Sequence, residues 1–510
     1  MSKKFDVVVI GSGLGGLCAA LECLRAGKKV LLVEQHNLPG GFASSFTRGR
    51  FEFEPSLHEL PNTRTESTTS GVVRYLMEDA ELRIDFLSIP EAYRLILTDQ
   101  NLDACLPFGV DDFIKAIEKE VPGSTPAVTN FMNLCKEVQN AFNALEGSGK
   151  RVPIIQTIKK YTNFIRTGSA TVKQVANALN MPKKALDMIY PYWCYLGVPA
   201  SRMSFSIWAA LLDTYISAGA LIPKFRSHEI ACAFLEKIYE LGGTVQFNSK
   251  VTSIQVHEGQ VAGVILANGE IIQSKQVISN TSPTNLFNNL VSPKKEVPRK
   301  AYANINTRKH GLSLFVVYLG LNASKEELGL NEYSYFISPH MDTERLYTST
   351  YNINTDEIMQ ASICLNAANP GCSPEGTTIL SITAGFHTEA WEKISAKEYF
   401  KTKDRIAKKL IQQFEKATNT DIFKHIEEIE IATPETFARY TGAYNGIVYG
   451  YEPEPWDGIV PRVLAQDKEN YIEGIQFCGG FSYRCHGYGS SVMSGKAAAE
   501  RTCAKMEGAS

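Results

Sequence analysis

Apolar residues at the start of the chain change from the period of a strand to that of a helix and back. Residues 5–10 form a short apolar run rich in β-branched side chains, as is typical of a strand buried on both faces. Between residues 17 and 24, apolar side chains recur at helical spacing, which places them on one face. A second apolar run, residues 30–33, ends at Glu34. The pattern therefore predicts a strand, a turn, a helix and a second strand.

The predicted turn has the glycine-rich sequence GSGLGG. In a dinucleotide site, Gly11 makes the tight turn, Gly13 lets the pyrophosphate approach bare backbone, and Gly16 lets the helix pack against the strand. The pyrophosphate would lie at the helix N-terminus, where unpaired amides favour negative charge. A glycine-rich turn without a ligand is the alternative. The strand, the helix and an acidic residue all stand where the motif requires them, which favours the dinucleotide.

Glu34 lies where a carboxylate accepts hydrogen bonds from the adenosine ribose, and its charge disfavours a 2′-phosphate. Residues 34–53 read EQHNLPGGFASSFTRGRFEF, and His58 follows. This stretch resembles the N-terminal signature of the phytoene desaturase, carotenoid isomerase and retinol saturase family of FAD-dependent oxidoreductases, within the amine-oxidase-like superfamily. The resemblance implies FAD as the cofactor, with Gly40 and Gly41 passing close to its flavin side.

The resemblance also implies the fold class, which is α/β. We expect a discontinuous Rossmann-like FAD-binding domain of the glutathione-reductase type plus a mixed α+β substrate domain. Later blocks similar to the family divide the chain accordingly. The FAD-binding domain is expected at residues 1–65, 210–290 and 430–510, and the substrate-binding, helical cap domain at residues 66–209 and 291–429.

Two of these later blocks carry cofactor-binding residues in the family. Residues 230–280 read as a helix feeding a meander of strands, with hairpin turns, and the resemblance places Val251 beside the adenine. Near the end of the chain, a last strand runs into glycines and is followed by a closing helix whose amides would face the flavin. The residues expected to bind the cofactor are Gly11, Gly13, Leu14, Gly15, Gly16, Glu34, Gln35, Gly40, Gly41, Phe42, Val251, Gly479, Gly480, Ser490 and Ser491.

The chain departs from the family where small residues usually stand before the closing helix. Here the loop reads FSYRCHGYG, which brings reactive and hydrogen-bonding side chains toward the expected flavin. His486, Tyr488 or Cys485 could exchange a proton with a substrate. Arg484 could pair with a substrate carboxylate, and Cys485 or His486 could bond the flavin covalently. The alternative is that they only fill space or hold the loop. The candidate catalytic residues are therefore His58, which follows the signature, and Arg484, Cys485, His486 and Tyr488 from this loop.

Composition narrows the range of partners. A net charge of −2 over 510 residues gives no electrostatic case for nucleic acid. No apolar run is long enough to span a membrane, and the short N-terminus leaves no room for a removable signal. The 11 cysteines are scattered, which indicates reduced thiols in a cytoplasmic protein, and no metal-ligand cluster is visible. Residues 154–166 could form a basic amphipathic helix with peripheral membrane contact, although an ordinary solvated helix is the more common reading of such a pattern.

The leading hypothesis is an FAD-dependent oxidoreductase acting on CH–CH bonds, with an unknown electron donor or acceptor. It would saturate or desaturate a carbon–carbon bond of an extended apolar or amphipathic, isoprenoid- or polyene-like molecule. A flavin amine or amino-acid oxidase is one alternative, because Arg226 and the polar loop would suit a charged substrate. A polyene cis–trans isomerase without net redox chemistry is another. A redox-inert protein that keeps FAD or carries an isoprenoid is the third.

Overall fold

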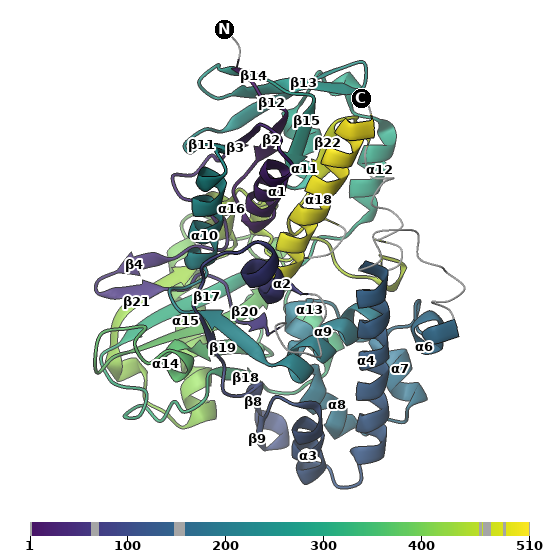
Figure 1. The fold of residues 1–510 in the computed structure, drawn as a ribbon. Coiled ribbons are helices and arrows are strands. Elements are labelled where there is room, and N and C mark those ends of the chain that lie inside the picture. Colours follow the sequence, from purple (N-terminus) through teal and green to yellow (C-terminus); the bar gives the residue numbers. More distant parts are fainter. Residues whose placement is uncertain are drawn as a thin grey trace.

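The computed structural model describes residues 3–62, 71–146, 159–457, 462, 471–482 and 486–508. Two parts lie one above the other in Figure 1: an upper part that holds both ends of the chain, and a lower part made of a large sheet and a group of helices. The candidate site lies where these parts meet.

A five-stranded sheet with the order β11-β3-β2-β15-β22 forms the centre of the upper part. All its pairings are parallel. β2 (Val7–Ile10) and β3 (Val30–Val33) are buried at every residue, which explains their uninterrupted apolar sequences. The other strands are β11 (Thr244–Gln246), β15 (Gln276–Ser279) and β22 (Ile475–Phe477), so three separated parts of the chain build this sheet.

Helices cover one face of this sheet and a smaller sheet covers the other. Val7 and Val9 pack in one core with α1 (Leu14–Arg25), α10 (His228–Glu240) and α18 (Tyr488–Gly508), while Val8 and Ile10 pack in another core with the smaller sheet. Figure 1 shows α1 and α18 side by side. The smaller sheet consists of β1 (Lys3–Lys4), β14 (Ile271–Gln273), β13 (Gln260–Leu266), β12 (Val251–His257) and β16 (Val291–Ser292), in that spatial order.

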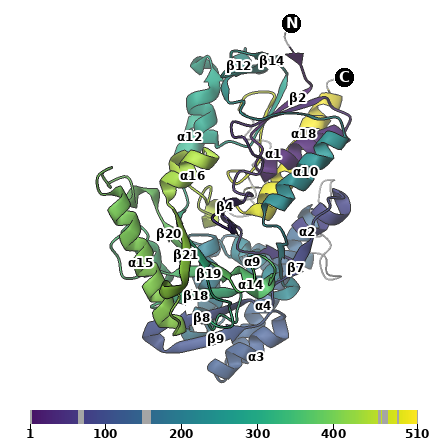
Figure 2. The same cartoon turned by 90° about the vertical axis from the view of Figure 1, so that its left-hand side faces the viewer.

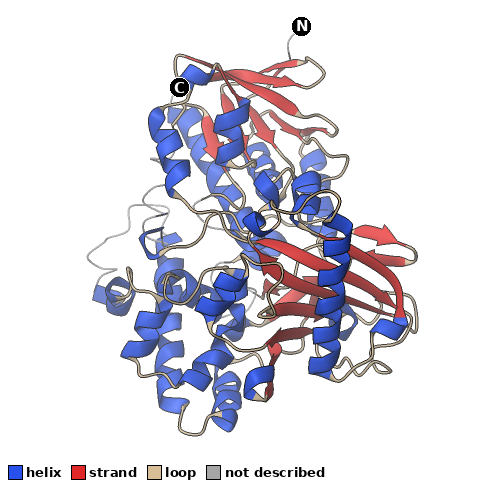
Figure 3. Ribbon diagram, turned by 180° about the vertical axis from the view of Figure 1, so that it is seen from behind, coloured by secondary structure: helices blue, strands red, loops and turns tan. Residues whose placement is uncertain are grey.

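The lower part is built on a seven-stranded mixed sheet. α15 (Tyr399–Thr418) lies across one face of it in Figures 2 and 3 and buries Ile406, Leu410 and Phe414 there. The strands, in spatial order, are β21 (Ile426–Ala432), β17 (Ser313–Leu321), β20 (Thr378–Phe386), β19 (Gln360–Cys364), β18 (Ser334–Ser338), β8 (Tyr93–Leu97) and β9 (Leu102–Leu106).

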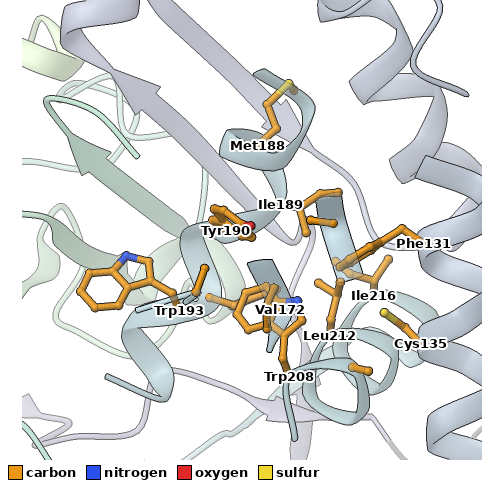
Figure 4. Packing of buried hydrophobic residues seen from close by; sticks show 14 of the residues in the cluster. Phe131, Cys135, Val172, Met188, Ile189, Tyr190, Trp193, Trp208, Leu212 and Ile216 are labelled. Atoms are coloured by element: carbon orange, nitrogen blue, oxygen red, sulfur yellow. The ribbon is translucent and has the colours of Figure 1, made fainter. Parts of the chain in front are cut away.

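A group of helices stands beside this sheet and shares one core with it. Figure 4 shows Trp208 and Leu212 packed with Phe131 and Ile189. Trp208 is fully buried, so its ring anchors the helix that carries it. The helices are α3 (Val110–Glu120), α4 (Thr125–Glu146), α7 (Val172–Ala178), α8 (Lys183–Ile189) and α9 (Phe205–Ala218).

Short elements connect the two parts, among them the sheet β6-β10-β7. Its middle strand directly follows α9 and leads back toward α10, so it links the helical group to the upper sheet. The connecting elements include β4 (Phe46–Arg48), β5 (Phe51–Phe53), β6 (Leu60–Pro61), β7 (Phe86–Ser88), β10 (Ala220–Pro223), α2 (Val72–Arg74) and α16 (Pro434–Thr441).

The α/β fold predicted from the sequence is confirmed, and the first unit has the expected order of strand, glycine turn, helix and strand. The closing helix begins at Tyr488. Residues 154–158 of the amphipathic stretch lie outside the described residues. None of the described helices combines the length and the apolar character that crossing a membrane requires. The domain boundaries stay a prediction.

Candidate functional site

A cavity of about 1510 Å³ opens where β2 meets α1 and follows the carboxyl ends of the upper strands. In open parallel sheets this is the edge at which ligands bind. Most of the residues expected to bind a cofactor lie in its wall: Gly11, Gly13, Leu14, Gly15, Glu34, Gln35, Gly40, Gly41, Phe42, Val251, Gly479, Gly480 and Ser491. Gly16 lies behind this wall, and Ser490 lines a second, smaller cavity.

Glycines leave the backbone at the head of this cavity bare and closely packed. A Cβ on Gly13 would lie 2.4 Å from Nδ2 of Asn280, and one on Gly15 would lie 2.7 Å from the amide nitrogen of Gly479. A Cβ on Gly16 would come within 1.9 Å of the carbonyl oxygen of Gly11. Gly16 therefore lets α1 approach β2, while Gly13 and Gly15 let Asn280 and Gly479 pack against the start of α1.

The N-terminus of α1 carries no internal acceptor for its free amides. Its first flanking residue, Gly13, has no capping side chain, and its first turn contains no acidic residue. Unpaired amides at a helix N-terminus favour an anion. The bare backbone, the free helix end and the length of the cavity together fit the pyrophosphate of a dinucleotide.

Glu34, directly after β3, is held at the edge of the same cavity by hydrogen bonds from the glycine turn. Its Oε2 accepts hydrogen bonds from the amide and the hydroxyl of Ser12, both at 2.7 Å, and its Oε1 accepts one from the amide of His36 at 2.8 Å. These donors fix the carboxylate in one orientation. The glycine turn therefore positions the acidic group expected at the adenosine ribose.

A second cavity, of about 400 Å³, extends from the first toward the lower part. Its wall is mostly aliphatic and aromatic and is built by α9, the lower sheet and the segment after β5, with Trp193, Leu211, Leu312, Ile358, Met359 and Ile363 among the residues that line it. This size lies in the usual range for sites of small molecules, and the lining suits an apolar one. The two cavities share Pro55, Ser56, Leu314, Tyr449, His486, Gly487 and Tyr488.

At this junction His486 and Tyr488 are held by hydrogen bonds to backbone carbonyls. Nε2 of His486 donates to the carbonyl oxygen of Tyr195 at 2.6 Å, and its ring stacks on that of Tyr449. The hydroxyl of Tyr488 donates to the carbonyl oxygen of Phe42 at 2.9 Å. Burial raises the pKa of Tyr488 well above its usual range, so the phenol keeps its proton. Both side chains thereby join the closing helix to other walls of the cavities.

Deeper in the small cavity, Tyr195 connects His58 with Glu59, the residue that follows it. The hydroxyl of Tyr195 lies 2.9 Å from Nδ1 of His58 and 3.0 Å from Oε1 of Glu59. Burial lowers the pKa of His58 to about 3, so its ring is neutral at physiological pH. Burial also raises the pKa of Glu59 to about 8, against the smaller opposite effects of the neighbouring phenols of Tyr195 and Tyr192. An uncharged polar group therefore faces an otherwise apolar cavity.

Comparison with known proteins agrees with this geometry. The profile of the flavin containing amine oxidoreductases matches residues 14–503. The chain belongs to this family. All-trans-retinol 13,14-reductase of Danio rerio is 26% identical over 491 residues, which cover 91% of this chain and 79% of the relative. Chloroplastic prolycopene isomerase of Daucus carota is 24% identical over 518 residues, which cover 99% and 81%.

Among solved structures, wild-type putrescine oxidase bound to putrescine superposes with a TM-score of 0.64 and 16% identity, covering 100% of both chains. This likeness concerns the fold. Membership of the flavin containing amine oxidoreductases makes flavin the cofactor class of the chain, in agreement with the resemblance seen in the sequence. A bound flavin supplies hydride and electron transfer, while the residues described above position it and its partner.

Some of the residues that the sequence analysis singled out are not found among the described residues that line the two cavities. Arg484 and Cys485 lie outside the described residues. Arg226 is buried, and its guanidinium donates to the carbonyl oxygens of Glu52 and Cys372, so those donors are engaged within the protein. The described cysteines are free thiols, and no metal-ligand cluster occurs among the described residues.

Sequence reasoning missed Glu59 and Tyr195, which stand out once the cavity is known. Glu59 directly follows His58, in the sequence Leu57-His58-Glu59-Leu60, and a carboxyl between apolar residues was the signal available. Tyr195 belongs to a distant aromatic stretch, and no local pattern connects it to the signature.

Proposed function

We propose that this protein is an FAD-dependent oxidoreductase that saturates or desaturates a carbon–carbon bond of an extended apolar or amphipathic, isoprenoid- or polyene-like substrate. The observation that carries the proposal is the continuity of the two cavities at His486 and Tyr488. A dinucleotide seated in the large cavity would bring its ring to this junction, where a substrate in the small apolar cavity meets it.

The choice of FAD rests on the geometry at the glycine turn and Glu34. The cavity reaches from Val251 and Glu34 past this turn to His486 and Tyr488, a course that suits an extended dinucleotide. Retinol and prolycopene, named in the relatives' activities, are extended apolar molecules and support the substrate class. The electron partner and a peripheral membrane contact stay predictions.

A test uses the purified holoenzyme with its flavin reduced anaerobically by dithionite. All-trans-retinol or prolycopene is then added, and flavin absorbance and product mass are followed. A saturating enzyme oxidises its flavin while the product gains two hydrogens. A desaturating enzyme, starting from oxidised flavin, yields a product that has lost two. Neither change with any polyene, together with hydrogen peroxide release from an amine, would contradict the proposal.

A cis–trans isomerase is a second candidate, favoured by the match to prolycopene isomerase over 99% of this chain. It would convert prolycopene into a product of unchanged mass, with the flavin in the same redox state before and after. Chromatography with mass detection separates the two candidates in one experiment. An amine oxidase has less support, because the guanidinium of Arg226 is bound to backbone carbonyls rather than exposed to the cavities.

A further inference from the structure

Glu59 is a carboxyl group without a charged partner in the wall of an apolar cavity. Its side chain is buried, with 4% of the residue exposed, and it lines the small cavity. Oε1 accepts a hydrogen bond from Tyr195 at 3.0 Å, while Oε2 makes no hydrogen bond within the described part of the chain. A buried, unpaired carboxylate is costly, and a carboxylic acid is much less so.

The groups around Glu59 are neutral or acidic. They are His58 and Glu91, the phenols of Tyr93, Tyr192, Tyr195, Tyr215 and Tyr333, and the thiol of Cys194. Arg462 also lines the cavity, but its guanidinium is paired with Asp457 at 2.9 Å. Within the described residues, the hydrogen bond from Tyr195 is the interaction in this environment that compensates a negative charge on Glu59.

Hydrogen bonds connect Glu59 through Tyr195 and His58 to Ser334, and all of them can point in the same direction. When Oε1 carries the proton, it donates to the hydroxyl oxygen of Tyr195, which donates to Nδ1 of His58. Nε2 of His58 then carries the remaining ring proton and donates to Oγ of Ser334 at 3.1 Å. The two hydroxyl groups and the imidazole can each donate and accept a hydrogen bond. When Glu59 loses its proton, all the hydrogen bonds of the row can therefore reverse their direction, and every group in the row stays paired.

We infer that Glu59 is the proton donor for saturation of a double bond held in the small cavity, and that Tyr195 and His58 position its carboxyl group. The inference rests on the proposed function and adds the proton donor to it. A bound flavin, reduced by a two-electron donor such as a dihydronicotinamide or dithionite, would supply the hydride to one carbon.

The step balances as follows. The π bond breaks, one carbon gains the hydride, and the neighbouring carbon gains the proton of the Glu59 carboxyl group. The carboxylate left behind accepts a hydrogen bond from Tyr195 and is reprotonated when water enters after the product leaves. Burial raises the pKa of Glu59 to about 8, so the acid form is available as a proton donor at neutral pH. The reverse reaction, desaturation, would require the carboxylate form of Glu59 as the base.

The first test reads the protonation state of Glu59 without turnover. Infrared difference spectra of the holoenzyme against Glu59→Gln should show a protonated carboxylic acid below pH 8 that disappears above it. Tyr195→Phe should move this titration to higher pH, because Tyr195 stabilises the carboxylate. A Glu59 that is fully ionised at neutral pH in the wild type would overturn the inference.

The second test measures flavin reoxidation by substrate in a single turnover. Glu59→Gln should retain flavin and bind the polyene, yet reoxidise its flavin about 100-fold more slowly, the usual size of an acid–base contribution. Asp213→Asn is the matched control, because Asp213 is a buried carboxyl with a raised pKa, about 6, that does not line the cavity. A wild-type rate in Glu59→Gln would overturn the inference.

The two proposals fail differently. If no polyene is converted by the wild type, the proposed function fails, while the infrared titration still reports whether Glu59 is a neutral acid. If Glu59→Gln does not fold, Tyr195→Phe supplies both readouts, and an unchanged titration together with an unchanged reoxidation rate in that variant contradicts the inference.

Discussion

The imidazole ring of His486 lies face to face with the phenol ring of Tyr449, with centroids 4.4 Å apart and planes 9° apart. Because Nε2 of His486 also donates to the carbonyl oxygen of Tyr195, the ring is fixed both in plane and along its edge. The stack stands where the two cavities meet, so it shapes the passage between cofactor and substrate.

Two substitutions of His486 separate the contribution of the ring stack from that of the hydrogen bond to Tyr195. His486→Phe keeps an aromatic ring for the stack but leaves the carbonyl of Tyr195 without this donor, which should cost about 1–3 kcal/mol of stability. His486→Ala removes the stack as well and should lose more. Urea unfolding of the holoenzymes measures both losses. Equal stability of wild type and His486→Phe would show that the hydrogen bond contributes nothing.

Glu34 should govern the affinity for the dinucleotide. Glu34→Gln keeps the shape of the side chain but removes the charge, and a hydrogen bond to a charged group contributes about 1.5–3 kcal/mol. We therefore expect FAD binding to weaken roughly 10- to 100-fold. Fluorescence titration of the flavin-free protein measures this. Glu240→Gln, on the exposed side of α10, is the control and should bind FAD as the wild type does.

Gly16 should tolerate no side chain. A Cβ there would lie 1.9 Å from the carbonyl oxygen of Gly11, so Gly16→Ala forces α1 away from β2. Such overpacking typically costs about 1–3 kcal/mol. The free energy of unfolding in urea should fall accordingly, with reduced flavin content. Gly508→Ala places its Cβ where no heavy atom lies within 4 Å and should leave both quantities unchanged.

Burial of His58 makes stability depend on pH. Its pKa falls from 6.5 to about 3 on folding, so below pH 6.5 the unfolded chain binds a proton that the native protein does not. Stability therefore decreases as the pH falls from 6.5 toward 3, by about 3 kcal/mol at pH 4 from this group alone. His58→Gln should flatten that part of the stability profile, measured by urea unfolding at several pH values. An unchanged acid slope would show that His58 is not buried in neutral form.

The sequence was sufficient for the features that local spacing encodes. The strand, glycine turn, helix and acid of residues 5–34 form one continuous unit, and each glycine there has a steric requirement that its neighbours reveal. The hydrogen bond between Glu59 and Tyr195 joins residues that lie 136 positions apart in the sequence. Periodicity says nothing about such contacts, because they are set by how the segment Tyr190–Tyr195 packs against the residues after β5. For the same reason the engagement of Arg226 by two carbonyls was invisible in the sequence.

Tyr488 shows how the structure changes the interpretation of a predicted acid–base residue. Its hydroxyl donates to the carbonyl of Phe42 and lies 2.9 Å from Oγ of Ser56. These bonds tie the first turn of α18 to the segment after the glycine pair, and burial keeps the phenol protonated. We therefore expect Tyr488 to position the closing helix rather than to exchange a proton.

Tyr488→Phe tests this expectation. Loss of the hydroxyl should lower stability by about 1 kcal/mol, the net contribution of a buried hydrogen bond. Flavin reoxidation by a polyene should change less than about 10-fold, because a general acid contributes at least 10²-fold. Single-turnover absorbance of the reduced holoenzyme gives that rate, and urea unfolding gives the stability. A loss of about 100-fold with unchanged stability would instead assign Tyr488 to proton transfer and make Glu59 redundant, because a single proton is added per double bond.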